Sequence, residues 1–275
     1  MELKTIALFF NSKRETCSKA AKDLKTSLEK EHIKTKILPY DNLKINQNFD
    51  LIFSLGGDGS LLKIVRKTAH LKIKILGLNF GHLGFLTYDK NAGIKELLRT
   101  LKADKFCLQE RALLEVQVIR NKKVAFKGIA LNECTIKSNK TRAIHLNTFY
   151  EKSELKEYFA DGIMLCTPTG STAYNLAAGG PILEPSLEAF ILTPICPHTL
   201  AQRPLVLKLN SPLFINGQDE AHLCLDGQIF FKLSKKDKVQ IKRSPLNAKI
   251  IFAQDYDFFK LLTQRLTWGG NCKNA

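Results

Sequence analysis

The order of hydrophobic segments most constrains what this chain of 275 residues can fold into. Over the first hundred residues, short apolar runs alternate with longer stretches whose apolar residues recur at helical spacing. We expect strands at Thr5–Phe10, Thr35–Pro39, Leu51–Leu55 and Ile73–Leu78, and helices at Arg14–Glu31, from about Ser60, and near Gly93–Lys102. Because this alternation is typical of a parallel sheet covered by helices, it predicts an α/β domain that binds ligands at the carboxyl ends of its strands.

After about Leu101 the pattern changes to a succession of strands, with one helix expected from about Ser171. The expected strands are Leu113–Arg120, Lys123–Ile136, Ile144–Tyr150, Gly162–Cys166, Leu205–Leu209, Leu213–Asn216, Ala221–Leu225, Gln228–Leu233 and Lys238–Ser244. This half predicts a β-rich second domain. Because no low-complexity linker separates the halves, we expect a packed pair of domains with a ligand-binding cleft between them.

The charge of the chain favours small anionic ligands over nucleic acid. Lys and Arg number 42 against 26 Asp and Glu, which gives a net charge of +16. The lysines are spread along the whole chain, whereas a nucleic-acid-binding protein is expected to cluster its basic residues. We therefore expect no nucleic-acid partner.

Neither export nor membrane insertion is expected. The longest uncharged run, 162–183, contains several glycines and prolines among hydroxyl residues, which is not typical of a membrane span. The start of the chain lacks the continuous apolar stretch of a secretory signal. The seven cysteines are scattered and form no CxxC pair, so reduced thiols in the cytoplasm are expected rather than disulfides or a zinc site.

A glycine-rich turn, Gly56-Gly57-Asp58-Gly59-Ser60, follows a buried strand and opens a helix. Glycines let the backbone approach a ligand closely, and the amides at a helix start point toward any phosphate placed there. A carboxylate repels phosphate unless a hydroxyl or a metal lies between them. Asp58 therefore suits a hydroxyl or a metal-bound phosphate, and the alternative is that it only caps the helix.

Asn132 and Glu133 form a second candidate site, at the end of the apolar run Gly128–Leu131. At the end of a strand, an amide and a carboxylate can converge on a polyol such as ribose. The alternative is an ordinary exposed strand end.

A third candidate runs from Asp161-Gly162 through Thr167–Asn175 to Gly179-Gly180-Pro181, where hydroxyl residues crowd a strand-to-helix turn. Ser171 is expected to cap the helix, which leaves the other hydroxyls for a polar ligand, and Tyr174 offers an aromatic face to a planar base. The chain lacks GxxxxGK[ST], an early GxGxxG, GxSxG and HExxH. Their absence disfavours P-loop enzymes, dehydrogenases, hydrolases and zinc proteases.

Together these segments resemble the NAD kinase family over nearly the whole chain. Gly56–Gly59 is similar to its GGDG motif, Asn132-Glu133 to its NE pair, and 161–181 to its DG…TPTGSTAY…GGP block. Asn79–Thr87, Pro197–Leu207 and Asp226-Gly227-Gln228 are also similar to that family. GGDG is shared with lipid kinases, so a lipid kinase and a non-catalytic dinucleotide sensor are the alternatives. The TPTGSTAY block is the specific part of the resemblance.

The resemblance implies an α/β domain over 1–100, a β-rich NAD-binding domain over 101–250 and a tail, 251–275, that packs on the first domain. It implies phosphorylation of the adenosine ribose 2′-hydroxyl of NAD by ATP, a phosphotransferase reaction on an alcohol, with a divalent cation such as Mg²⁺ carried by ATP and no protein metal site. A homodimer or homotetramer is also implied. Asp58 would be the general base, and the binding residues would be Asp58, Gly59, Asn132, Glu133, Phe159, Asp161, Thr172, Ala173, Tyr174, Asn175, Leu176, Ala177 and Gln228.

Phe159 departs from the family pattern, because the position two before Asp161-Gly162 is often Arg in NAD kinases. A phenyl ring cannot make an ionic contact, but its face attracts a cationic pyridinium. We therefore expect NAD to be preferred over NADH.

Overall fold

The computed structural model describes residues 3–38, 40, 45, 49–80, 84–89, 94–151, 153–208 and 210–266. The chain divides into two compact units, one formed by Met1–Glu110 with Ala248–Ala275 and the other by Arg111–Asn247. The chain passes from one unit to the other inside two long strands, β6 (Phe106–Arg120) and β16 (Lys238–Ala253). The second unit is thus an insertion in the sequence of the first.

The first unit is built on a parallel sheet. Its strands are β1 (Thr5–Phe10), β2 (Lys34–Leu38), β3 (Leu51–Leu55), β4 (Lys74–Asn79) and β5 (Thr87–Asp89). The order is β2-β1-β3-β4, and the other edge of β4 pairs with β5 and with the end of β16. The four predicted strands are confirmed, whereas three-residue β5 is too short for a sequence pattern to reveal.

The winding of this sheet changes direction between β1 and β3, because β2 lies on one side of β1 and β3 on the other. Crevices that bind ligands form at such a point, outside the carboxyl ends of the strands. Phe10 and Leu55 are the last paired residues of β1 and β3, so the turn that begins at Gly56 lies at this point. The fold therefore places the glycine-rich turn where a ligand site is expected.

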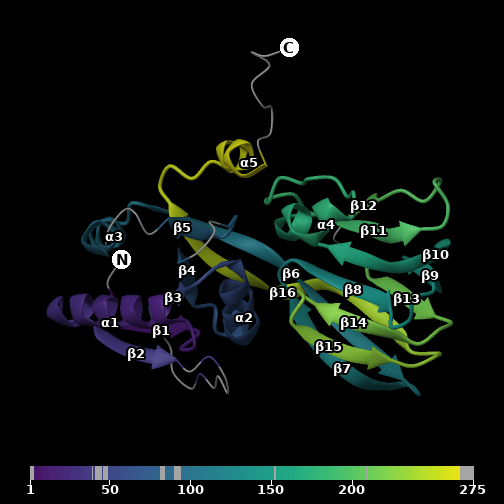
Figure 1. Cartoon of the computed structure of the whole chain (residues 1–275), viewed down its shortest axis with the longest axis horizontal. Helices are drawn as coiled ribbons and strands as arrows, with labels where there is room; N and C mark the ends of the chain where they lie inside the picture. Colours follow the sequence, from purple (N-terminus) through teal and green to yellow (C-terminus); the bar gives the residue numbers. More distant parts are fainter. Residues whose placement is uncertain are drawn as a thin grey trace, which may run out of the picture. The chain divides into compact units, whose positions relative to one another are not determined.

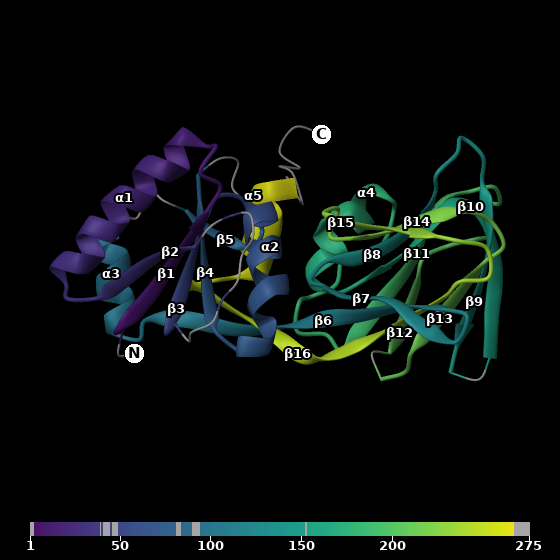
Figure 2. The ribbon, with the colours of Figure 1, turned by 90° about the horizontal axis from the view of Figure 1, so that it is seen from below.

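Helices cover both faces of this sheet: α1 (Glu15–Lys30) and α3 (Ile94–Lys102) lie on one side and α2 (Asp58–Thr68) on the other (Figure 2). A 3-10 turn, η1 (Ala69–Leu71), follows α2, and α5 (Phe258–Leu266) follows β16. The apolar face of α1 packs Ala21, Leu24 and Leu28 against Ile6 and Leu8 of β1. Burial of such faces is the main stabilising contribution to this unit.

The second unit is antiparallel and rich in strands (Figure 1). It contains β7 (Lys123–Ala130), β8 (Glu133–Ser138), β9 (Ile144–Tyr150), β10 (Ser153–Cys166), β11 (Ala189–Pro197), β12 (Leu205–Lys208), β13 (Leu213–Gly217), β14 (Ala221–Leu225) and β15 (Ile229–Leu233). The order is β15-β14-β8-β10-β9-β13-β16, with β11 beside β10, β12 beside β11, and the β6–β7 hairpin beside β16. The predicted fold class, an α/β part followed by a β-rich part, is confirmed.

Several predicted elements of this unit are wrong in extent. The expected strand Lys123–Ile136 is two strands, β7 and β8. Strand β10 begins at Ser153, well before the expected Gly162, because its first half is largely exposed and shows no apolar alternation. Strand β11 was not expected, since Pro194 and Pro197 lack the amide hydrogen that a strand uses for pairing.

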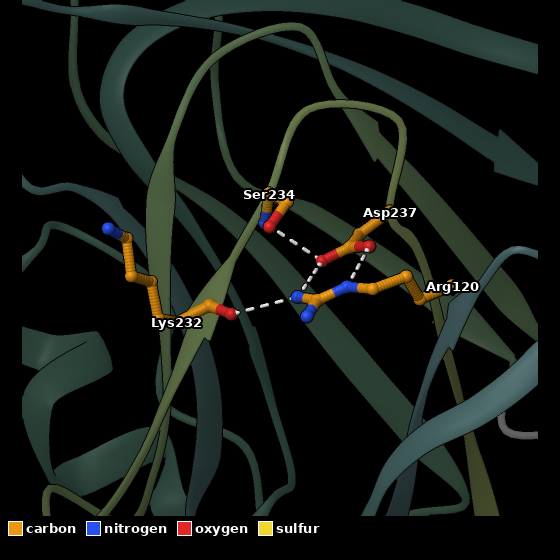
Figure 3. A network of polar contacts seen from close by, with 4 residues as sticks. All are labelled: Arg120, Lys232, Ser234 and Asp237. Carbon is orange, nitrogen blue, oxygen red and sulfur yellow. Dashed lines mark hydrogen bonds and ion pairs between the residues drawn. The ribbon is translucent and has the colours of Figure 1, made fainter.

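An ion pair in the second unit joins the end of β6 to the turn between β15 and β16 (Figure 3). The carboxylate of Asp237, which is 3% exposed, accepts bonds from Arg120 Nε at 2.9 Å and Nη2 at 2.7 Å. It also accepts the Ser234 amide at 2.8 Å, while Arg120 Nη2 donates to the Lys232 carbonyl at 3.2 Å. This two-point contact fixes the hairpin end against β6.

Candidate active site

The carboxylate of Asp58 points away from the helix that it begins. Helix α2 starts at Asp58, and the residue in the N-cap position is Gly57. Asp58 Oδ2 accepts the amide of Phe85 at 2.9 Å, and Oδ1 accepts the amide of Leu86 at 3.3 Å. The side chain therefore binds the segment that leads into β5. The alternative interpretation of Asp58 as a helix cap is wrong.

Two glycines make this arrangement possible. Gly56 has a φ of +151°, and a Cβ there would lie 2.5 Å from Ser60 Oγ. Gly84 comes still closer to the carboxylate, since a Cβ there would lie 2.1 Å from Asp58 Oδ1. The glycine-rich turn in the sequence indicated that the backbone is closely approached at Gly56. The contact between Gly84 and the Asp58 carboxylate could not be predicted, because it joins segments that are distant in the sequence.

The surroundings of Asp58 suit a group that accepts a proton. Burial raises the pKa of this carboxyl above its usual value, and the amides of Phe85 and Leu86 and the positive charge of Arg265 oppose that rise. A carboxylate with a raised pKa is a stronger base than an exposed one. Arg265 lies on α5, so the C-terminal helix contributes to the electrostatics of this site.

In the second unit, Asp226 separates strand β7 from strand β8, at Leu131 and Asn132. Its carboxylate accepts the amides of Leu131, Asn132 and Glu133 at 3.1, 2.8 and 3.3 Å. The amide of Asp226 in turn donates to the Glu133 carbonyl at 3.0 Å. Because these amides bond to a side chain, the backbone turns between β7 and β8.

That turn leaves polar side-chain atoms buried and available. Asn132 and Glu133 are 8% and 6% exposed, and within the described part of the chain Asn132 Oδ1 and Glu133 Oε2 have no hydrogen-bond partner. Burial, with the negative charge of Asp226, raises the pKa of Glu133 to about 8. Buried polar atoms are normally hydrogen-bonded, so this pair has the character of a ligand site. The alternative of an exposed strand end is wrong.

The hydroxyl-rich turn is built differently from the expectation. The helix expected from Ser171 is a 3-10 turn, η3 (Thr169–Thr172), followed by the single turn α4 (Tyr174–Ala177). Thr167 Oγ1 donates to the Leu131 carbonyl at 2.6 Å, and Ser171 Oγ donates to the Pro168 carbonyl at 2.7 Å. Both residues are fully buried. Their hydroxyls therefore hold the turn together, and the expectation that Ser171 caps a helix while the others bind a ligand is wrong for Thr167 and Ser171.

Asn175 is also committed to internal bonds. It is fully buried, its Nδ2 donates to the carbonyls of Ser171 and Pro181, and its Oδ1 accepts Thr193 Oγ1 at 2.6 Å. A Cβ at Gly180 would lie 2.0 Å from Asn175 Oδ1, so this close packing requires glycine there. The structure gives Asn175 the contacts of a positioning residue for α4.

The remaining residues differ in exposure. Tyr174 is 37% exposed and accepts Lys137 Nζ at 3.2 Å, which links α4 to β8. The Thr167 amide donates to the Asn132 carbonyl at 2.8 Å, which brings the hydroxyl-rich turn beside the Asn132–Glu133 pair. Thr172, Ala173 and Leu176 are half-buried, whereas Asp161, Ala177 and Gln228 are exposed. Asp58 and the exposed Gly59 belong to the first unit and all the others to the second.

Phe159 lies among aromatic rings. Its centroid is 4.5 Å from that of His145, in a stacked arrangement, and 4.5 Å from that of His198, in a tilted one. His145 Nδ1 lies 3.0 Å from Glu157 Oε1. One face of the phenyl ring is therefore already covered by an imidazole.

Comparison with known proteins covers both units. Residues 5–106 match the model of the ATP-NAD kinase N-terminal domain, and residues 131–253 match that of the C-terminal domain. The chain belongs to the ATP-NAD kinase family. Its relatives in this family include the NAD kinase of Desulforamulus reducens, 34% identical over 96% of this chain and 97% of that one. The NAD kinase of Sulfurimonas denitrificans is 37% identical over 82% and 80%.

Two solved kinase structures share the fold of this chain. A yeast NADH kinase complexed with NADH superposes with a TM-score of 0.89 over 100% of this chain and 91% of that one, at 23% identity. An NAD kinase from Archaeoglobus fulgidus in complex with ATP has a TM-score of 0.74 over 96% and 98%, at 26% identity. The fold is thus retained where most of the sequence differs.

Three groups that shape these sites were not predicted from the sequence of this chain. They are the Phe85 and Leu86 amides, the charge of Arg265, and the carboxylate of Asp226. Only Asp226 carried a local signal: Asp226 and Gly227 have φ of +49° and +64°, and an Asp-Gly pair between strands predicts a tight hairpin turn. The others depend on contacts between segments far apart in the sequence.

Proposed function

We propose that this protein is an NAD kinase, which transfers the terminal phosphoryl group of ATP to NAD and releases NADP and ADP. Membership of the ATP-NAD kinase family supports this activity, as do the relatives named NAD kinase that span most of the chain. A lipid kinase is not favoured, because the match includes the C-terminal family domain as well as the GGDG motif.

Within this activity we assign the acceptor to the 2′-hydroxyl of the adenosine ribose and the general base to Asp58. The observation that carries this assignment is the half-buried carboxylate of Asp58 at the start of α2, which accepts the backbone amides of Phe85 and Leu86. Oriented amides keep a base in place, and the raised pKa strengthens its attraction for a proton. Asp58 takes the hydroxyl proton as the ribose oxygen bonds to the terminal phosphorus and the bond to ADP breaks.

The dinucleotide is proposed to bind beside Asn132 and Glu133. Their buried oxygen atoms suit ribose hydroxyls, and Tyr174, which is partly exposed, suits a planar base. Asp161, Thr172, Ala173, Leu176, Ala177 and Gln228 complete this proposed pocket, with Phe159 beside it, Asn175 holding α4 in place, and Gly59 next to the base in the first unit.

The divalent cation is proposed to arrive with ATP. Among the residues that the structure describes, no group of three or more His, Cys, Asp or Glu side chains is arranged to hold a metal ion. Mg²⁺ commonly binds through substrate phosphates and water with few protein ligands. The cation neutralises phosphate charge, and this chain contributes the orientation of the hydroxyl and the acceptance of its proton.

Location and assembly are part of the proposal. All six cysteines in the described part of the chain are free thiols, which supports a cytoplasmic enzyme. None of the helices described has the length and apolar character needed to cross a membrane. A homodimer or homotetramer is proposed from the family resemblance, and light scattering of the purified protein measures it.

The decisive test is ADP release from ATP in the presence of NAD, with NADP identified as the product. Asp58→Asn keeps the size of the side chain and removes the base, so turnover should fall by about 10²–10⁴ while NAD affinity stays within a few-fold. Glu15→Gln is the matched control, because Glu15 is an exposed acid in the first turn of α1. Near-normal turnover of Asp58→Asn would contradict the general-base assignment.

A further inference from the structure

The second unit buries two neighbouring acidic residues, Asp226 and Glu133, and backbone amides bond to the carboxylate of only the first. Asp226 is 5% exposed, and its carboxylate accepts three amides, from Leu131, Asn132 and Glu133. Glu133 is 6% exposed, yet its Oε2 has no partner within the described residues. Amide donors stabilise a negative charge, so the surroundings favour ionised Asp226 and not ionised Glu133.

Two carboxylates in one buried place do not both ionise at neutral pH. The backbone amide of Glu133 donates to Asp226 Oδ1 at 3.3 Å, so the Asp226 carboxylate lies against the backbone of Glu133. Because Asp226 accepts the three amides, Glu133 is the carboxyl group that keeps its proton. The pKa of Glu133, about 8 through burial and the charge of Asp226, agrees with this distribution.

Among the described residues, the titratable groups next to Glu133 on its own strand and on the facing strand are two cysteine thiols. Cys166 on β10 is its partner across the strands, and Cys134 follows it on β8. Burial raises the pKa of both thiols well above the usual value, so both stay neutral. The buried guanidinium of Arg111 lies at the neighbouring turn, where its Nη1 is 3.5 Å from Thr169 Oγ1.

We propose that Glu133 binds its ligand as a neutral carboxylic acid, which donates its proton to one hydroxyl oxygen of a vicinal diol while Asn132 Oδ1 accepts from the neighbouring hydroxyl. This inference rests on the proposed function, in which the diol belongs to a ribose of NAD. In this arrangement the diol gives a partner to both buried oxygen atoms, and the neutral acid adds no negative charge beside an anionic dinucleotide. The same site with an ionised glutamate repels that ligand.

Infrared difference spectroscopy of the ligand-free protein tests the protonation directly. The carbonyl stretch of a carboxylic acid lies well above the bands of a carboxylate. We expect the unmodified protein at pH 7 to show an acid band that Glu133→Gln lacks and that Glu154→Gln, a change at an exposed acid on β10, retains. Absence of the band from the unmodified protein would overturn the proposal.

Binding of NAD without ATP, measured by calorimetry between pH 6.5 and 9.5, tests the recognition. If only the neutral acid binds, a group with a pKa of about 8 makes the dissociation constant rise about 30-fold by pH 9.5. Glu133→Gln retains a neutral donor, so it should bind NAD within about threefold of the unmodified protein at pH 6.5 and show no rise.

Other outcomes are equally informative. A flat pH profile in the unmodified protein, or a loss of more than about tenfold in Glu133→Gln at pH 6.5, would overturn recognition by the neutral acid, and a dissociation constant that falls with rising pH would show that the ligand needs the charged form. Failure of the unmodified protein to bind NAD at any pH would contradict the proposed function, whereas the infrared band would still decide the protonation of Glu133. A circular dichroism spectrum confirms that each variant is folded.

Discussion

The close approach between Gly84 and Asp58 provides a test of how the base is held. A methyl group at position 84 would lie 2.1 Å from Asp58 Oδ1, which is too short for any contact. The carboxyl group is the end of a side chain and can swing away, so Gly84→Ala should leave the fold intact and displace the base from the amides of Phe85 and Leu86.

The expected size of the effect follows from those two bonds. Hydrogen bonds to charged groups contribute about 1.5–3 kcal/mol each, and the Leu86 bond at 3.3 Å is the weaker of the two. If losing both bonds raises the activation free energy by roughly 2–4 kcal/mol, kcat decreases about 30- to 1,000-fold. Because the amides lower the pKa of Asp58, losing them should also move the acidic limb of the kcat profile to higher pH.

Steady-state kinetics from pH 5 to 9 with saturating ATP and NAD measure both effects. Gly217→Ala is the matched control, since a Cβ there meets its nearest atoms at 3.6 and 3.8 Å, which are ordinary contacts. If Gly84→Ala keeps kcat within about threefold and its acidic limb does not move, the amides do not position the base and the argument fails.

Three further predictions concern other parts of the molecule. Asp237→Ala should lower the melting temperature by several degrees at pH 7, whereas a change at the half-exposed Glu31 should not. Burial raises the pKa of Asp237, but the bonds from Arg120 and Ser234 outweigh it, so the pKa lies below its usual value. The difference in melting temperature should therefore shrink as pH falls toward 3 in calorimetric scans. Purified protein should contain no stoichiometric metal by elemental analysis, yet lose turnover with a chelator; tightly bound metal would contradict delivery by ATP. Phe159→Gly should lower the ratio of kcat/KM for NAD to that for NADH. An unchanged ratio would show that the Phe159 ring does not contribute to the preference for NAD.

The sequence predicted the elements whose signals are local. The strand before Gly56 is buried along its whole length and ends at glycines, so both the strand and the turn could be identified from adjacent residues. The Asn132–Glu133 pair was likewise found because polar residues follow an apolar run. Both candidate sites lie at strand ends, where side-chain chemistry and backbone geometry depend on the same few residues.

What the sequence could not predict depends on long-range contacts. Hydroxyl residues look alike whether they bind a ligand or the backbone, and Thr167 bonds a carbonyl 36 positions away. The same limitation applies to Asp58, whose amide partners lie 27 and 28 positions further along. A sequence motif shows which side chain is present, but its hydrogen-bond partner is known only from the folded structure.

The two passages of the chain through β6 and β16 have a consequence for the order of folding. The parallel sheet of the first unit takes its last strand from residues that follow the whole second unit, since Lys249 and Ile250 pair with Lys74 and Ile75. During synthesis the contiguous residues 111–247 emerge from the ribosome before this strand does. The second unit can therefore fold first, while one side of β4 stays unpaired at these positions. An unpaired strand edge favours aggregation, so the nascent chain is exposed to it until β16 has formed.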